Sequence, residues 1–202
     1  IVMKLKIFFI FFLLLSFKEI RSQEGKIRAQ EGHRKNFTET RKKIFYFCTF
    51  PLNHLQYKFN QNLSWWSEIE EGLILGAMPL KKHLSKLKQS YPKLSILSLN
   101  DSFEMKKSIV AHPISKRKWQ QQGVLFKQIN VSDYESLSLK QIKEACEFIE
   151  KERNRQHTVY VHCKAGKGRS ATVVIAYLLS KRKSINPYDA LSLVRYKRPQ
   201  IG

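Results

Sequence analysis

Cysteine and acidic residues are scarce in this sequence, and their scarcity excludes several classes of protein. Its 202 residues include three cysteines, Cys48, Cys146 and Cys163, which are too few and too scattered for a disulfide framework or a zinc site. We therefore expect a reducing compartment, no structural metal and no cofactor. The 16 Asp and Glu residues are outnumbered by 37 Lys and Arg residues, which gives a formal net charge of +21. This charge favours an anionic partner, but it does not choose among nucleic acid, acidic lipid and a phosphorylated substrate.

Long apolar runs are also rare, and the longest lies near the N-terminus. The stretch MKLK, which begins at Met3, is followed by IFFIFFLLLSF, a combination typical of a targeting segment. This run is too short to span a bilayer as a free helix. We expect a targeting or membrane-anchoring segment over residues 1–22 and a basic, loosely ordered linker over 23–64. Residues 65–202 are expected to form one domain whose C-terminus is incomplete.

From Trp65 onwards, two kinds of apolar pattern alternate. Short runs rich in β-branched and aromatic residues predict strands, and amphipathic or capped stretches between them predict helices. Ser138 and Gln141 have the spacing of a capping box, which predicts a helix start. Strands are predicted at 72–79, 94–100, 124–131 and 157–162, and helices at 80–91, from Ser138, at 170–179 and at 187–196. The alternation indicates an α/β fold, a mainly parallel sheet flanked by helices, whose ligands bind at the carboxyl ends of the strands.

The stretch VHCKAGKGRSA, which begins at Val161, lies between the last predicted strand and a predicted helix. Its glycines and alanine let the backbone curl so that successive N–H groups point inward, and such a nest, closed by a helix N-terminus, binds a tetrahedral dianion. Arg169 can add two hydrogen bonds to the same anion. The expected phosphate-binding residues are Lys164, Ala165, Gly166, Lys167, Gly168 and Arg169. A nucleotide triphosphate loop is excluded because the second Gly-Lys-Ser/Thr is missing.

Cys163 is the expected nucleophile at the start of this loop. The helix end, the inward N–H groups and Arg169 stabilise its thiolate, so its pKa is expected to fall from about 8.5 into a range of roughly 3.5 to 7.5. Ser170 is expected to donate to the sulfur and ease its later departure, and His162 is expected to brace the loop backbone. The alternative for Cys163 is a buried small residue at the end of a strand.

A second catalytic group is expected, because the leaving oxygen needs a proton and the covalent intermediate needs an activated water. Asp133 is the candidate, since it follows a predicted strand and lies in a short loop before a capped helix. Glu135 and Asp101 are the fallback carboxylates. Lys164 and Lys167 are expected to recognise an extra negative charge on the substrate, or else to be merely solvated. No cluster of metal ligands is visible in the sequence, so metal-independent catalysis is expected.

A cysteine preceded by His and followed by five residues and Arg-Ser is the signature of the protein tyrosine phosphatase superfamily, and VHCKAGKGRSA closely resembles its phosphate loop. The stretches WWSEIEEGLILGAMPL, LSLNDSFE and KWQQQGVLFKQINVSD extend the resemblance, over about residues 66–199, to the mitochondrial phosphatidylglycerophosphate phosphatases of the dual-specificity branch. This resemblance implies a dual-specificity phosphatase fold with Cys163 as nucleophile, Arg169 as phosphate clamp and Asp133 as general acid. Ser102 departs from the family, which carries an acid there.

We therefore expect a cysteine-dependent phosphoric monoester hydrolase that acts on phosphatidylglycerophosphate. The alternatives are a dual-specificity protein tyrosine/serine/threonine phosphatase, a phosphoinositide phosphatase of the tensin-homologue type, and an inactive phosphate-binding module. Expected partners are a phospholipid or phosphoprotein substrate and an acidic membrane surface, with no nucleic acid, and the chain is expected to be a monomer. The expected location is the mitochondrial inner membrane, with the endoplasmic reticulum or another membrane as the alternative.

Overall fold

The computed structural model describes residues 31–60, 63–109, 111–133, 135–182 and 184–201, so the expected targeting segment, residues 1–22, lies outside the described residues. The chain divides into two compact units, residues 1–42 and 43–202. In the first unit, the described residues are helical and begin helix α2 (Glu31–Phe59), which continues into the second unit. Across the described ranges, every helix is either too short or too polar to cross a membrane.

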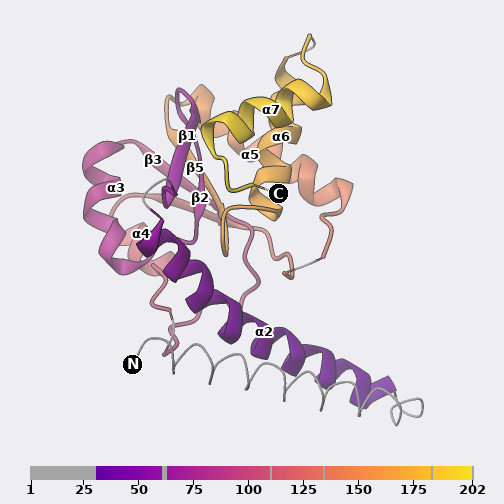
Figure 1. Cartoon of the computed structure of the whole chain (residues 1–202). Coiled ribbons are helices and arrows are strands. Elements are labelled where there is room, and N and C mark those ends of the chain that lie inside the picture. The colour runs from indigo at the N-terminus through magenta and orange to yellow at the C-terminus, as the bar shows by residue number, and fades with distance from the viewer. Residues whose placement is uncertain (1–30, 61–62, 110, 134, 183, 202) are drawn as a thin grey trace. The chain divides into compact units, whose positions relative to one another are not determined.

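A five-stranded sheet forms the centre of the second unit (Figure 1), with the strand order β1-β2-β5-β3-β4. Strand β1 runs antiparallel to β2, and the other neighbouring strands are parallel. The strands are β1 (Trp66–Glu70), β2 (Leu73–Ala77), β3 (Leu94–Ser98), β4 (Leu125–Gln128) and β5 (Thr158–Cys163). The helices after α2 are the short η1 (Lys81–His83), α3 (Leu84–Ser90), α4 (Lys116–Gln121), α5 (Leu139–Asn154), α6 (Arg169–Lys181) and α7 (Pro187–Lys197). The mainly parallel α/β fold predicted from the sequence is confirmed.

Helices cover both faces of this sheet, and strand residues alternate between two cores because successive side chains of a strand point to opposite faces. Leu73 and Leu75 of β2 belong to the core formed with α5, α6 and α7, whereas Ile74 between them packs with Leu87 of α3 and Trp119 of α4. All residues of β2 and β3 are buried, which explains their nearly continuous apolar sequence. Covering both faces leaves the carboxyl ends of the strands as the edge where a site can form.

The helix starts predicted from capping patterns are confirmed. Ser138 accepts a hydrogen bond from the Gln141 N–H and donates its own N–H to the Gln141 side chain, so the capping box at the start of α5 is complete. Asn186 caps α7 by accepting from the Asp189 N–H at 3.0 Å. Strand β1 and helix α4 were not predicted, because each is mostly polar and buries a single side chain, Ile69 in β1 and Trp119 in α4.

The region before residue 65 differs from the sequence-based prediction. The sequence predicts a loosely ordered linker over 23–64, but helix α2 occupies residues 31–59 of it. Tyr46 and Phe50 lie four residues apart, so they share a face of the helix, and both are buried in a cluster with Met78. Burial of these aromatic rings against the folded domain stabilises a helix that neither composition nor propensity signals.

Candidate active site

The loop predicted to bind phosphate connects β5 to α6 at the carboxyl end of the parallel strands. Cys163 is the last residue of β5 and Arg169 is the first of α6. Gly166 between them has a φ of 66°, and a Cβ atom added there would lie 2.3 Å from the carbonyl carbon of Gly76. Glycine is therefore required at this position by both conformation and space, and the loop is tightly curled against β2.

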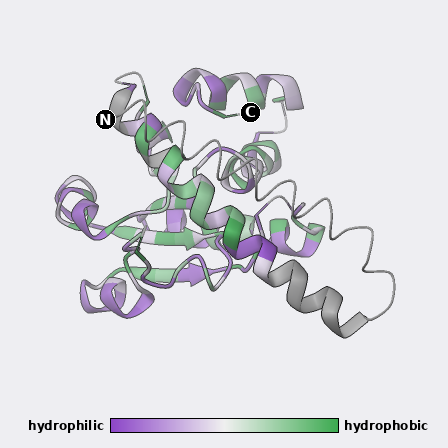
Figure 2. Cartoon of the chain, turned by 60° about the horizontal axis from the view of Figure 1, so that its bottom comes forward, coloured by the Kyte–Doolittle hydropathy of each residue, from purple (hydrophilic) through white to green (hydrophobic). Residues whose placement is uncertain are grey.

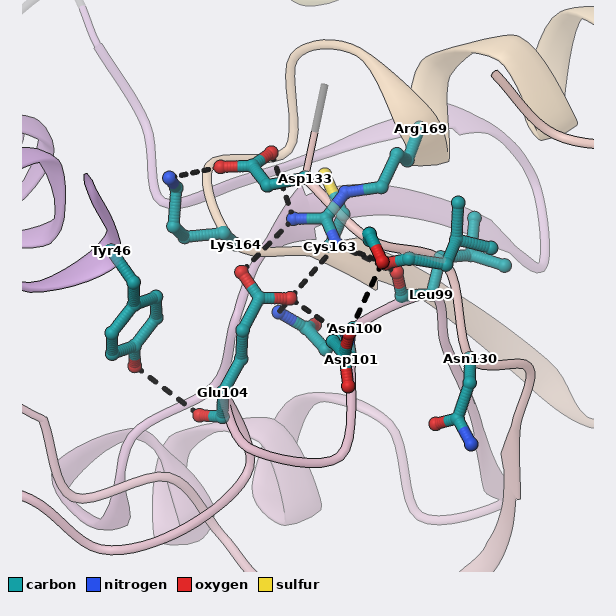
Figure 3. Close-up of polar contacts among 12 residues, drawn as sticks. Tyr46, Leu99, Asn100, Asp101, Glu104, Asn130, Asp133, Cys163, Lys164 and Arg169 are labelled. Carbon is teal, nitrogen blue, oxygen red and sulfur yellow. Dashed lines mark hydrogen bonds and ion pairs between the residues drawn. The ribbon is translucent and has the colours of Figure 1, made fainter. Parts of the chain in front are cut away.

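The side chain of Cys163 is buried within this loop (Figure 3), and its surroundings favour the thiolate. Burial alone raises the pKa of the thiol. The Arg169 guanidinium, the Ser170 hydroxyl and the backbone N–H groups of Ser170 and Gly166 outweigh burial, so the pKa lies below its ordinary value. The Ser170 Oγ lies 3.2 Å from the Cys163 Sγ. These groups therefore stabilise the anionic form of the cysteine, which is its reactive form.

The guanidinium of Arg169 is fixed by buried acceptors. Its Nη1 donates to the Glu104 carboxylate at 2.8 Å, to the Val131 carbonyl at 2.6 Å and to the Leu99 carbonyl at 3.1 Å. Its Nε is buried and has no hydrogen-bond partner among the residues that the structure describes. A buried N–H donor without an acceptor is unfavourable, so an anion oxygen bound in the loop would satisfy it. Arg169 thus has a donor available for a phosphate group.

Glu104 is a positioning residue that acts through Arg169. Its carboxylate is fully buried and accepts hydrogen bonds from both Nη atoms of Arg169, from the Asn100 side chain at 3.1 Å and from the Asp101 N–H at 2.8 Å (Figure 3). The Tyr46 hydroxyl of α2 donates to the Glu104 carbonyl at 3.2 Å. In the sequence, Glu104 lies in the stretch LSLNDSFE, which resembles the family, but no role was predicted for it. The one available signal was an acid just past a buried strand in an acid-poor chain.

Replacement of Glu104 by alanine is expected to lower both stability and activity. The buried Arg169 charge would lose its carboxylate partner, so the free energy of unfolding should fall by about 3 kcal/mol or more. Arg169 would also be less well oriented, so kcat/KM for an aryl phosphate should fall at least about tenfold. Urea denaturation and steady-state kinetics measure the two effects. Glu104→Gln keeps a hydrogen-bond acceptor at this position and should lose less stability and less activity than Glu104→Ala. Equal activity in the wild type and the two variants would contradict this role.

Asp133 reaches the same loop from the segment that follows β4. Its Oδ1 lies 3.0 Å from an Arg169 nitrogen, and its Oδ2 forms an ion pair with Lys164. The side chain is 27% exposed, so it is placed at the rim rather than in the core. Of the fallback residues, Glu135 lines the cleft above the loop, whereas Asp101 accepts a hydrogen bond from Ser132.

A cleft of about 520 Å³ opens above the loop. It brings together the sequence-predicted residues Asp133, Cys163, Lys164, Ala165, Lys167, Gly168 and Arg169 with the fallback residue Glu135, and adds Ser136, Leu137 and Thr172. Its walls combine cationic groups near the sulfur with apolar groups further out. Within the described ranges, no group of three or more His, Cys, Asp or Glu residues is arranged to hold a metal ion.

Both lysines of the loop contact helix α2. Lys164 Nζ donates to the Thr49 hydroxyl at 2.9 Å, and Lys167 Nζ donates to the Gln56 side chain at 3.0 Å. Lys164 is buried, whereas Lys167 is partly exposed. Burial lowers the pKa of Lys167, and the nearby positive charge of Arg198 lowers it further. Of the two lysines, Lys167 is the more accessible to a second anionic group of a substrate.

Two residues that sequence reasoning missed hold the carbonyl groups of the loop. Arg198, which is buried after α7, donates to the Gly166 carbonyl at 2.7 Å and to the Tyr57 hydroxyl at 2.9 Å. Tyr57 of α2 in turn donates to the Ala165 carbonyl at 2.7 Å. Holding these carbonyls on one side of the loop leaves its N–H groups free to face the bound anion. No motif joins Tyr57 to Arg198 in the sequence, so their role follows only from the fold.

His162, the expected brace of the loop, lies in β5 next to the nucleophile. The ring is fully buried, and burial lowers its pKa to about 3, so it is neutral at physiological pH. It packs edge-on against the Tyr160 ring, and its backbone carbonyl accepts from the Leu99 N–H at 2.8 Å. A neutral buried imidazole fits a structural role, and bracing by its side chain stays a prediction.

Replacement of Ser170 by alanine is expected to slow catalysis without unfolding the domain. The hydroxyl helps to lower the pKa of Cys163, so its loss should raise that pKa and weaken the sulfur as a leaving group. We expect kcat to fall about tenfold or more, with accumulation of the phosphocysteine in rapid-quench experiments. Ser170→Thr retains the hydroxyl and serves as the control. Unchanged kcat and thiol pKa in the alanine variant would contradict this role.

A buried thiol, a glycine-bent loop between a parallel strand and a helix, and a fixed arginine together form a site suited to a phosphate group. The sequence profile of the dual specificity phosphatase catalytic domain matches residues 86–202, more than half of the chain. The chain belongs to this family, whose members are phosphoric monoester hydrolases. The family resemblance found in the sequence is confirmed.

Similar proteins include phosphatidylglycerophosphate phosphatases. The chain is 33% identical over 163 residues to PTPMT2 of Arabidopsis thaliana, with 79% of this chain and 66% of that protein covered. It is 32% identical over 160 residues to PTPMT1 of the same plant, of which it covers 45%. The chain thus spans about half to two-thirds of the length of these relatives. The crystal structure of PTPMT1 in complex with PI(5)P superposes with a TM-score of 0.62 at 26% identity, over 69% of this chain and 86% of that one.

Proposed function

We propose that this protein hydrolyses a phosphate monoester through a phosphocysteine intermediate, with phosphatidylglycerophosphate as its substrate. The chemical part rests on the burial of Cys163 beside the Ser170 hydroxyl and the Arg169 guanidinium, which lower the pKa of its thiol. It rests also on the buried Arg169 Nε–H, which has no hydrogen-bond partner among the described residues. The thiolate supplies the nucleophile, and the loop N–H groups and Arg169 stabilise the oxygens of the transferring phosphoryl group. Under this proposal the protein's own groups perform the reaction without a metal ion.

In the first step, the Cys163 thiolate attacks phosphorus, a sulfur–phosphorus bond forms, and the bond from phosphorus to the ester oxygen breaks. Asp133, in its protonated form, gives its proton to the leaving oxygen, so phosphatidylglycerol departs with a neutral hydroxyl group. The placement of Asp133 at the rim, within an ion pair of Arg169, supports this role. Glu104 keeps the guanidinium in place throughout.

In the second step, the Asp133 carboxylate takes a proton from water, whose oxygen attacks phosphorus. The sulfur–phosphorus bond breaks, inorganic phosphate leaves, and the thiolate of Cys163 is regenerated. The hydroxyl of Ser170, 3.2 Å from the sulfur, stabilises the departing thiolate. One carboxylate thus serves as acid and then as base, as in other hydrolases with covalent intermediates.

The lipid substrate is supported by the relatives and by the charge of the cleft. Relatives at 32% and 33% identity are phosphatidylglycerophosphate phosphatases. Their substrate carries a phosphodiester beside the monoester, so a second negative charge must be met near the loop. Lys167, partly exposed in the cleft wall, is placed to meet it.

Two other substrates are favoured by specific observations. The superposing PTPMT1 structure contains PI(5)P, which supports a phosphoinositide, and a dual specificity protein phosphatase of Arabidopsis thaliana is 34% identical over 66% of this chain, which supports a phosphoprotein. Release of inorganic phosphate from phosphatidylglycerophosphate, phosphoinositides and phosphopeptides, each in the same detergent, separates the three. We expect the highest kcat/KM for phosphatidylglycerophosphate, and a clear preference for phosphopeptides would overturn the lipid assignment.

We further propose that the protein acts as a monomer at the mitochondrial inner membrane, on an acidic lipid surface. The acid-free apolar segment within residues 3–18 and the net charge of +21 support this location. A fusion of residues 3–40 to a fluorescent reporter is expected to enter mitochondria. Entry into the endoplasmic reticulum would show this location to be wrong and leave the chemistry untouched.

A further inference from the structure

Helix α2 has an apolar face that points away from the folded domain. Ile44, Phe47, Leu52 and Leu55 are each between 42% and 46% exposed, although they are large hydrophobic residues. Ile44 and Phe47 are three residues apart, as are Leu52 and Leu55, so each pair is adjacent on the helix surface. At 3.6 residues per turn, all four fall within an arc of about 140° on one side of the helix. Figure 2 shows the hydrophobic colour continuing along this part of α2. We call these four residues the apolar face of α2.

A different side of the same helix is part of the active site. Thr49 and Gln56 accept hydrogen bonds from Lys164 and Lys167, and Tyr57 donates to the Ala165 carbonyl. Gln56 directly follows Leu55 and lies one turn beyond Leu52. The apolar face and the residues that contact the phosphate loop therefore lie on the same turns of α2.

The charge around α2 favours an anionic lipid surface as the partner of the apolar face. Residues 40–67 contain no Asp or Glu, whereas Arg41, Lys42, Lys43 and Lys58 are basic. A second copy of the chain would bring two such basic segments together, which is unfavourable. An anionic lipid leaflet offers both an apolar interior for the hydrophobic side chains and negative head groups for the lysines.

We propose that the apolar face of α2 inserts into an anionic lipid leaflet and thereby places the cleft above lipid head groups. This inference rests on the proposed function for its substrate, because a lipid phosphate monoester would then reach Cys163 without leaving the membrane. Binding to the lipid surface itself does not depend on that substrate. Helix α2 would link lipid binding to the active site, because its other side accepts hydrogen bonds from Lys164 and Lys167.

The test compares the full chain with the double variant Leu52→Asp and Leu55→Asp. Vesicles of phosphatidylcholine with phosphatidylserine provide an anionic surface that is neither substrate nor product. We expect vesicle binding in co-sedimentation, and hydrolysis of a phosphate monoester lipid embedded in vesicles, to fall at least about tenfold in the variant. Hydrolysis of a soluble aryl phosphate should stay unchanged. Leu125→Asp, at a leucine of β4 that is also 45% exposed, is the matched control and should behave as the wild type.

A second measurement keeps the test decisive if another part of the chain also binds lipid. Cys48 is one turn from Ile44 and can carry an environment-sensitive fluorophore in a Cys146→Ser, Cys163→Ser background. A blue shift on vesicles and protection from aqueous iodide are expected. No spectral change, or wild-type vesicle binding by the double variant, would overturn the inference, as would a concentration-dependent dimer that the double variant abolishes. If the wild type binds vesicles but fails to hydrolyse lipid monoesters in detergent, the proposed substrate is wrong and the lipid-binding face stands.

Discussion

The variant Cys163→Ser is expected to lose at least about a thousandfold in kcat toward any phosphate monoester, because a serine hydroxyl is far less acidic than a thiol and stays protonated in the same surroundings. Its loop, with the N–H groups and Arg169, should remain able to bind inorganic phosphate. Hydrolysis of an aryl phosphate, followed by absorbance, measures the loss.

Circular dichroism and phosphate binding by calorimetry establish that this variant is folded with an intact loop. Cys146→Ser, at a half-buried cysteine of α5, is the matched control and should retain full activity. Turnover by the Cys163→Ser protein within about tenfold of the wild type would rule out a covalent phosphocysteine.

Asp133→Asn is expected to lower kcat for an alkyl phosphate by about a hundredfold to ten-thousandfold, because the leaving alkoxide would depart without a proton. The loss should shrink for a nitrophenyl ester, whose leaving group is stable as an anion. Steady-state kinetics across a series of leaving groups measures this dependence.

The same variant should bind phosphate at least as well as the wild type. In the unliganded protein the Asp133 carboxylate occupies Arg169 and Lys164, and asparagine would no longer compete with phosphate for these cations. Glu135→Gln, at the other carboxylate lining the cleft, is the control and should change kcat little. A larger loss in the Glu135 variant than in the Asp133 variant would transfer the role of general acid to Glu135.

The sequence was sufficient to predict the sheet and the loop because their determinants are local. The β-branched run ending at Cys163, the two glycines after it and the Ser138 capping box each act within about ten residues, and the structure has the corresponding elements. Gly166 carries the positive φ that such a turn requires. Signals that act within so few residues can be recognised in the sequence without knowledge of the tertiary contacts.

The support of the site was not predictable, because it depends on residues that meet only in the folded chain. Glu104 and Arg169 are 65 residues apart, and Tyr57 and Arg198 are 141 apart. Glu104 is distinguished only by complete burial, which no pattern in a polar stretch such as NDSFE reveals. Helix α2 was missed for the same reason, since its stability comes from packing of Tyr46 and Phe50 rather than from its own sequence.

The central claim is that the surroundings of Cys163 keep its thiolate ionised at neutral pH, and the rate of its alkylation by iodoacetamide as a function of pH tests this most directly. Because the folded-state pKa is lowered, the rate should stay high as the pH falls through about 8.5, the ordinary thiol value, and decline only at lower pH. The half-buried Cys146, whose pKa burial raises, is an internal control that should react only at higher pH. A midpoint for Cys163 below the ordinary value is predicted, and a midpoint at or above it would contradict the account.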